Sequence, residues 1–109
     1  MKIAVTAKGA GLGAWLDPIF ETCLQIVIVD DRDCFEAWMN PYRETNPNNT
    51  LALAEKLALE KVDMLVTGSI TPQSLKKLGE AGIEVRTADR GSILELVEAA
   101  RNHTLPPAV

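Results

Sequence analysis

The residues best suited to bind a ligand lie where a buried apolar run ends at Gly68 and the pair Thr71-Pro72 follows. Thr71 is a favourable helix N-cap, and Pro72 at the first helical position loses no hydrogen bond, because that N–H would be unpaired anyway. The turn therefore leaves backbone N–H groups beyond the carboxyl end of a strand. Open α/β sheets bind ligands at this position, and exposed N–H donors favour anions. We predict an anion-binding turn that includes Gly68, Ser69 and Thr71.

Cys23 is the residue that could bind a metal near this turn, because it closes the long connection that follows the first predicted strand. A thiolate is a soft, anionic ligand that suits copper(I), zinc or an iron–sulfur unit. The alternative is an inert, buried side chain at the start of a strand, since cysteine is among the most buried residue types.

Cys34 is expected to be structural. A turn over residues 31–33 would place Val29 opposite Cys34 and Cys23 opposite about Asn40. The two cysteines would then be roughly 20 Å apart, or six residues at ~3.3 Å each. We therefore predict neither a disulfide nor a shared metal.

Two further motifs imitate functional sites. The glycine run of residues 9–13 has the spacing G-x-G-x-G instead of G-x-G-x-x-G, and Pro18 interrupts the crossover helix that a dinucleotide site needs. We interpret this run as a flexible loop. Asp30, Asp31 and Asp33, with Glu36 nearby, resemble a carboxylate metal site by composition, but a solvated turn is favoured because Asp is a common turn residue.

The hydrophobic pattern predicts the elements that position these residues. Strands are expected over residues 2–7, 24–30, 34–39, 63–67 and 83–87, and helices over 50–61, 72–81 and 93–102. Two short connections followed by helical crossovers predict a mixed five-stranded sheet, in the order β-β-β-α-β-α-β-α, with only the second strand antiparallel. This α/β arrangement resembles the ribonuclease H-like architecture. Its long connections, residues 8–22, 40–49, 68–71 and 88–91, would meet at one end of the sheet.

Length and composition limit the function. The 109 residues suit a single domain, whose tail, residues 103–109 with Pro106-Pro107, is expected to be flexible. A net charge of −4 argues against nucleic acid and acidic membranes as partners. No apolar run approaches the ~20 residues of a membrane span, and no signal peptide is evident, so we expect a cytoplasmic protein. No nucleophile–base pair or zinc-ligand pattern is present, so we expect no enzyme.

Several segments resemble the dinitrogenase iron–molybdenum cofactor biosynthesis family of small prokaryotic proteins, over nearly the whole chain. They are Met1-Lys2-Ile3-Ala4-Val5, Leu16-Asp17-Pro18-Ile19-Phe20, Ile26-Val27-Ile28-Val29-Asp30, Asn40-Pro41, Thr67-Gly68-Ser69-Ile70-Thr71-Pro72 and Ala81-Gly82-Ile83-Glu84-Val85. The resemblance implies a ribonuclease H-like fold without nuclease activity. It also implies a nitrogenase accessory role in binding iron–molybdenum–sulfur clusters or their precursors, and one relative holds a molybdenum–copper sulfide cluster.

The resemblance implies a non-catalytic carrier that binds such a cluster transiently and exchanges it with donor or acceptor proteins. The cluster site would include Asp17, Cys23, Asn49, Thr50, Gly68, Ser69 and Thr71, with Cys23 as the metal ligand. The chain departs from the family pattern in four places. Glu21-Thr22 replaces Gly-Arg after Phe20, Asp17 lies where many members have a histidine, Asn46–Thr50 replaces a glycine-rich segment, and Ser69 replaces the second glycine of the turn.

The alternative function is a cofactor-free interaction or regulatory domain, in which the glycine loop and Trp15 form a docking face. Trp15 is expected to fold back onto the core, although a partner could also cover it. Trp38, on a strand at the margin of the sheet, could pack under a helix or line a self-association surface. We expect a monomer or a weak dimer.

Overall fold

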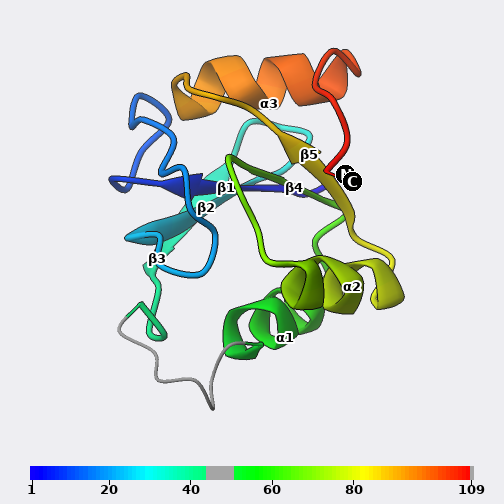
Figure 1. Cartoon of the computed structure of the whole chain (residues 1–109). Helices are drawn as coiled ribbons and strands as arrows, with labels where there is room; N and C mark the ends of the chain where they lie inside the picture. Colours follow the sequence, from blue (N-terminus) through cyan, green and yellow to red (C-terminus); the bar gives the residue numbers. More distant parts are fainter. Residues whose placement is uncertain (44–50, 109) are drawn as a thin grey trace.

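The computed structural model describes residues 1–43 and 51–108, which form a five-stranded sheet between helices (Figure 1). The strand order is β3-β2-β1-β4-β5. β2 runs antiparallel to both β1 and β3, whereas β4 is parallel to β1 and to β5. The predicted topology, with only the second strand reversed, is confirmed. The strands are β1 (Ile3–Ala7), β2 (Gln25–Val29), β3 (Phe35–Met39), β4 (Met64–Thr67) and β5 (Glu84–Thr87).

The three helices cover both faces of the sheet. They are α1 (Ala52–Leu59), α2 (Pro72–Glu80) and α3 (Ile93–Arg101). Figure 1 shows α1 and α2 on one face and α3 on the other. Each helix begins and ends within about two residues of its prediction. The residue at the N-cap of α1 is Leu51, which makes no side-chain capping hydrogen bond. Asn49 and Thr50, two predicted site residues, lie outside the described residues.

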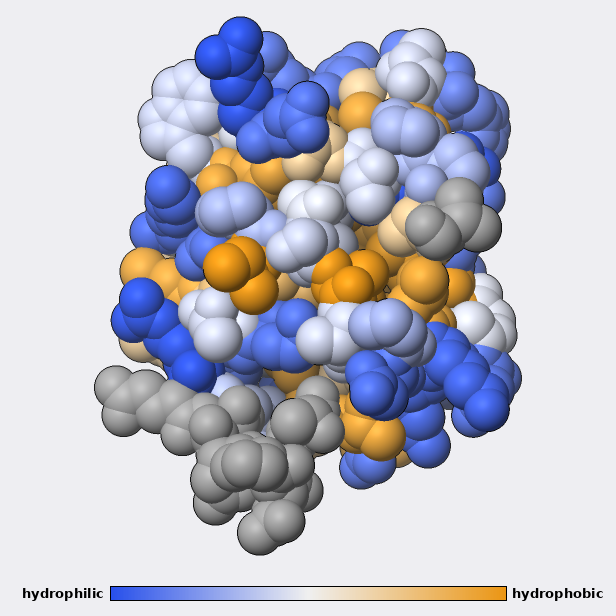
Figure 2. All heavy atoms as spheres, in the orientation of Figure 1, coloured by the Kyte–Doolittle hydropathy of each residue, from blue (hydrophilic) through white to orange (hydrophobic). Residues whose placement is uncertain are grey.

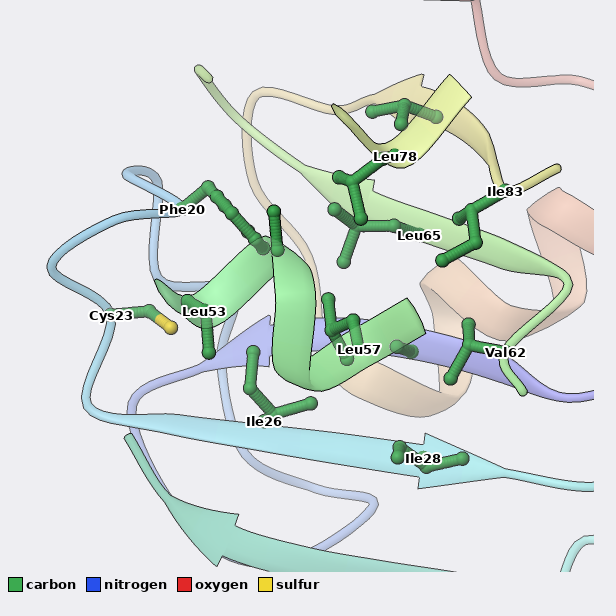
Figure 3. Close-up of a cluster of buried hydrophobic side chains, with 13 residues drawn as sticks. Phe20, Cys23, Ile26, Ile28, Leu53, Leu57, Val62, Leu65, Leu78 and Ile83 are labelled. Carbon is green, nitrogen blue, oxygen red and sulfur yellow. The ribbon is translucent and has the colours of Figure 1, made fainter. Parts of the chain in front are cut away.

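Successive side chains along each strand point to opposite faces of the sheet, so the protein has one hydrophobic core on each face. One core lies under α1 and α2 and contains Phe20, Cys23, Ile26, Leu57 and Leu65 (Figure 3). The other lies under α3 and contains Ile3, Val27, Val66, Ile93 and Val97. β1, β2 and β4 contribute to both cores, which is why they read as nearly continuous apolar runs. On the face seen in Figure 2, hydrophobic residues form small separate patches among hydrophilic ones.

The register of the β2–β3 hairpin differs by one residue from the prediction. Val29 pairs with Phe35, and not with Cys34, so Cys34 lies opposite Asp30. The reason is the turn, in which Asp33 adopts a left-handed conformation with φ of 61°. The Asp30 carboxylate accepts hydrogen bonds from the N–H groups of Arg32 and Cys34, which makes Asp30 and Cys34 the pair that flanks the loop of residues 31–33. Both cysteines are free thiols, so the prediction that they form no disulfide is confirmed.

The segment after α3 returns along β5, as the last, red part of the chain in Figure 1 shows. The N–H of Thr87 donates to the Pro106 carbonyl at 2.8 Å, and the N–H of Ala108 donates to Val85 at 3.0 Å. The guanidinium of Arg86 donates to the Leu105 carbonyl at 3.0 Å. The sequence pattern suggested a flexible tail, whereas the structure attaches its described residues to the outer margin of β5. No helix among the described residues combines the length and apolar character needed to cross a bilayer.

Candidate functional site

Residues 8–24, here called the first loop, cross the carboxyl end of the sheet and connect it to both helix layers. Ile19 forms a bridge with Ser69 after β4, and Trp15 forms one with Ser92 before α3. The N–H of Leu16 donates to the Gly91 carbonyl at 2.9 Å. As the sequence predicted, the connections after β1, β4 and β5 meet at one end of the sheet. Hydrogen bonds between them make this end a continuous surface.

Two buried threonines fix the first loop to the sheet. Thr6 on β1 and Thr67 on β4 are both fully buried, and their hydroxyl oxygens lie 3.0 Å apart. The Thr6 hydroxyl also lies 2.7 Å from the Asp17 carbonyl. Sequence analysis did not identify this pair. A threonine near the end of each of two adjacent parallel strands, both on the same face, is the signal that could have found it.

Gly68 is required where the first loop meets the turn after β4. A Cβ atom at this position would lie 2.5 Å from the Pro18 carbonyl oxygen, which no side chain tolerates. The same oxygen accepts a hydrogen bond from the Ser69 N–H at 2.6 Å, and the Phe20 N–H donates to the Ser69 carbonyl at 3.0 Å. The predicted turn therefore touches the first loop directly, with backbone against backbone.

The N-terminus of α2 already holds an anionic oxygen from the protein itself. Thr71 is the N-cap, and its hydroxyl accepts a hydrogen bond from the Ser74 N–H, as predicted. A carboxylate oxygen of Glu21 lies 3.2 Å from the Thr71 nitrogen and 3.3 Å from its hydroxyl. Carboxylates are favourable at helix N-termini because of the exposed N–H groups and the helix dipole. The acid that replaces the family's Gly-Arg segment thus occupies the predicted anion-binding turn.

Asp17, a predicted site residue, supports the first loop. Its carboxylate accepts a hydrogen bond from the Leu24 N–H at 3.0 Å, and its own N–H donates to the Thr6 carbonyl at 2.9 Å. These bonds close the loop on itself just before β2. We infer that Asp17 positions the loop and that its carboxylate is already engaged.

Cys23 lies in the core and not on the surface. Its side chain is fully buried and points toward α1 near Leu53 (Figure 3). The Asn40 amide donates to the Cys23 carbonyl at 3.0 Å and lies 3.8 Å from its sulfur. Burial, with smaller contributions from the charges of Asp17 and Glu21, raises the pKa of the thiol to about 12. The thiol is therefore protonated and enclosed, which fits the alternative that the sequence left open.

Trp15 is exposed, contrary to the expectation that it folds back onto the core. Its side chain is 61% exposed, whereas the next residue, Leu16, is 5% exposed. The backbone of this segment is held on two sides, by Lys8 and by Ser92, and so behaves as a strand. Successive side chains then alternate between core and solvent, and Leu16 takes the inward position. Ile19 and Leu94 add exposed apolar side chains at the same end of the sheet.

Ser69 lies at the margin of a shallow cavity of about 280 Å³. The other residues lining this cavity are uncharged, and they come from the turn, α2, β5 and the returning tail: Ile70, Leu75, Thr87, Pro107 and Ala108. A neighbouring cavity of about 360 Å³ lies between β5 and α3 and includes Arg90. Both cavities lie at the carboxyl end of the sheet, and the first of them reaches the predicted turn at Ser69 and Ile70.

The acidic residues of the β2–β3 turn are engaged in ion pairs and backbone contacts. The amino terminus pairs with Asp31 and lowers the pKa of that carboxyl, and Arg101 pairs with Asp33 at 2.8 Å. In the described ranges, no group of three or more His, Cys, Asp or Glu side chains could hold a metal ion. The hydrogen bonds and ion pairs of these acids agree with the interpretation of the segment as a turn.

Comparisons with known proteins agree with this geometry. The model of the dinitrogenase iron–molybdenum cofactor family matches residues 1–103. The apo form of the orange protein from Desulfovibrio gigas is similar, with a TM-score of 0.92 and 29% identity over 99% of this chain and 92% of that chain. No curated protein sequence matches the chain.

Two more distant structures share the fold. A NifB-like protein from Thermotoga has a TM-score of 0.84 and 18% identity, covering 97% of this chain and 91% of that chain. A dinitrogenase-like protein from Methanocaldococcus jannaschii has a TM-score of 0.68 and 17% identity, covering 99% and 94%. With the family model spanning nearly its full length, this chain belongs to the dinitrogenase iron–molybdenum cofactor family.

Proposed function

We propose that this protein is a non-catalytic carrier that binds an anionic metal–sulfur cluster transiently at the carboxyl end of its sheet. The cargo would be an iron–molybdenum–sulfur or molybdenum–copper–sulfur cluster, exchanged with donor and acceptor proteins. Family membership supports the class of cargo, and the similar orange protein structure is described as an apo form. The proposal includes Gly68, Ser69 and Thr71 as the binding turn.

The contact between Glu21 and Thr71 is the observation that carries the proposal. The N–H and hydroxyl of Thr71 hold a carboxylate oxygen, so these donors already bind an anionic group in this chain. Glu21 reaches them from a different segment, 50 residues earlier in the sequence. An anionic cluster would displace the Glu21 side chain and take over the same donors. The uncharged cavity beside Ser69 would receive the body of the cluster.

Cys23 is not the first ligand assigned to the cluster in this proposal. It is the cysteine at the end of the first loop, which contacts the turn, but its thiol is buried and protonated. Metal binding by Cys23 would require the end of the first loop to leave the core. The backbone donors of the turn need no such opening, so we assign the cluster to them first, and the experiment includes Cys23 as a separate outcome.

The test is an anaerobic titration of the apo-protein with tetrathiomolybdate and copper(I), followed by gel filtration and visible spectroscopy. Wild type should retain charge-transfer absorption. Glu21→Gln removes the competing charge and should bind about three- to fivefold more tightly, equivalent to ~0.6–1 kcal/mol. The matched control, Glu95→Gln at the start of α3, should bind like wild type. Cys23→Ser should also bind like wild type, and a large loss there would identify Cys23 as a ligand.

A wild-type protein that retains no absorption would overturn the carrier proposal. The second candidate, a cofactor-free interaction domain, would then be favoured. The observation behind it is the exposure of Trp15, Ile19 and Leu94 at one end of the sheet. Exposed apolar side chains that share one surface are typical of protein docking sites.

A further inference from the structure

The outer margin of β3 is an unpaired strand edge. Within residues 1–43 and 51–108, β3 pairs with β2 alone. The N–H of Asn40 donates to Leu24, and the carbonyl of Cys34 accepts from Asp30, so even-numbered residues bond inward. The backbone groups of Phe35, Ala37 and Met39 therefore point away from the sheet. The opposite margin, β5, differs because the returning tail covers it.

The two faces of β3 carry different side chains. On the α3 side, Phe35 is 46% exposed and Met39 is 61% exposed, with Ala37 between them packed against the core. On the α1 side, Trp38 packs against the other core, and the ammonium of Lys56 lies 4.8 Å from the centre of its ring. Glu36 lies on this same face. It is exposed and has no ion pair in the part of the chain that the structure describes.

We propose that two copies of this protein form a symmetric dimer by antiparallel pairing of their β3 strands, centred on Ala37. In this register, the three outward-facing residues of one copy all lie opposite outward-facing residues of the other. Every outward N–H of the strand then finds a carbonyl acceptor across the twofold axis. The resulting sheet would run continuously through both copies, and their carboxyl ends would point in opposite directions.

Side-chain chemistry favours this register over the one centred on Glu36. Phe35 would lie opposite Met39 of the second copy, a contact between an aromatic ring and sulfur. Glu36 would lie opposite Trp38 of the second copy, where Lys56 of that copy already covers the ring. The symmetry repeats this Glu36–Lys56 attraction on both sides. A register shifted to centre on Glu36 would instead oppose two carboxylates, which is destabilising.

Sedimentation velocity from micromolar to millimolar protein tests the proposal without reference to any cluster. Wild type should show a concentration-dependent monomer–dimer equilibrium. Ala37→Pro removes an outward N–H and no hydrogen bond to β2, so the fold should persist while dimerisation weakens at least about tenfold. Ala37→Ser keeps the N–H and is the matched control, which should dimerise like wild type. Circular dichroism checks that each variant is folded.

Exchange of charges identifies the register. Glu36→Lys and Lys56→Glu should each weaken the dimer, because each places like charges together across the axis. The double variant should restore association to within about threefold of wild type. A wild type that stays monomeric over the whole range would overturn the proposal. So would a dimer that tolerates Ala37→Pro, or two charge variants whose effects simply add.

Discussion

The N-termini of α2 and α3 face the same end of the sheet, but their donors are satisfied in different ways. At α3, the N–H groups of Ile93 and Leu94 donate to carbonyls of the first loop, at 2.9 and 3.0 Å. The Glu95 N–H donates to the hydroxyl of the N-cap Ser92, and that hydroxyl donates to the Glu95 carboxylate at 2.9 Å. At α2, the first turn holds no acid of its own, and the anionic acceptor is a side chain from the first loop.

This difference explains why the anion site is assigned to α2. Backbone carbonyls that occupy the α3 donors cannot leave without unfolding the first loop. The Glu21 carboxylate at α2 can rotate away and leave the loop backbone in place. The Gln73 N–H also lacks an acceptor among the described residues. A helix N-terminus is therefore available to a ligand when its donors are free or hold a displaceable group. Four predictions test this comparison.

Gly68→Ala should have the largest effect, because it acts on the contact that brings the first loop to α2. The new Cβ would lie 2.5 Å from the Pro18 oxygen, so the backbone must move. We expect a loss of about 3 kcal/mol in the free energy of unfolding, measured by urea denaturation. Gly11→Ala, with no atom within 4 Å of its added Cβ, is the control and should change stability by less than about 0.5 kcal/mol. Equal losses would contradict the assigned contact.

Cys23 anchors the end of the first loop in the core under α1 and α2, and loss of its proton should weaken that anchor. The folded thiol keeps its proton to a pKa of about 12, whereas an unfolded thiol loses it near 9. Between these values the unfolded state binds fewer protons, so stability falls as pH rises, by up to ~1.4 kcal/mol per pH unit. Denaturation at pH 8 to 11 should show this slope in wild type and in Cys34→Ala, but not in Cys23→Ala. A slope that persists in Cys23→Ala would refute the assignment.

Removing the N-cap side chain should destabilise the protein more at α2 than at α3, and both losses should be smaller than that of Gly68→Ala. Thr71→Ala removes the cap of Ser74 and a donor to Glu21, so we expect a loss of about 1–2 kcal/mol. Ser92→Ala leaves the N–H groups of Ile93 and Leu94 bonded to the first loop, so the loss should be nearer ~0.5–1 kcal/mol. Thermal and urea unfolding would measure both. The reverse order would show that α3, and not α2, depends on its cap.

The smallest effect should come from neutralising the two acids. Glu21→Gln and Glu95→Gln should each lose ~0.3–1 kcal/mol at low ionic strength, since both carboxylates face a helix N-terminus. Millimolar sulfate should restore the stability of Glu21→Gln, because the Thr71 donors are no longer held by a carboxylate and can bind the sulfate ion. It should not restore that of Glu95→Gln, whose donors stay occupied. Melting temperatures with and without sulfate give the readout, and an equal response would remove the distinction between the helices.

Local pattern was sufficient to predict the framework of the molecule. The apolar runs, the short first two connections and the Thr71-Pro72 signal led to the observed order of elements along the chain and to the direction of all five strands. They also placed the turn at Gly68 and the N-cap at Thr71. Each of these features depends on residues within a few positions of one another, because helix caps and strand periodicity are local properties. The ligand of the turn remains a proposal.

Contacts between distant segments were decided only by the tertiary structure. Cys23 is buried because Leu53 of α1 packs near it, and the Thr71 donors hold Glu21 because Gly68 lets Pro18 approach. The β2–β3 register depends on one left-handed residue, Asp33, which the sequence does not mark. The composition of the first loop gives its polarity but not which of its side chains face inward. Burial and pairing across tens of residues depend on how the whole chain packs, and so a single sequence does not determine them by local pattern alone.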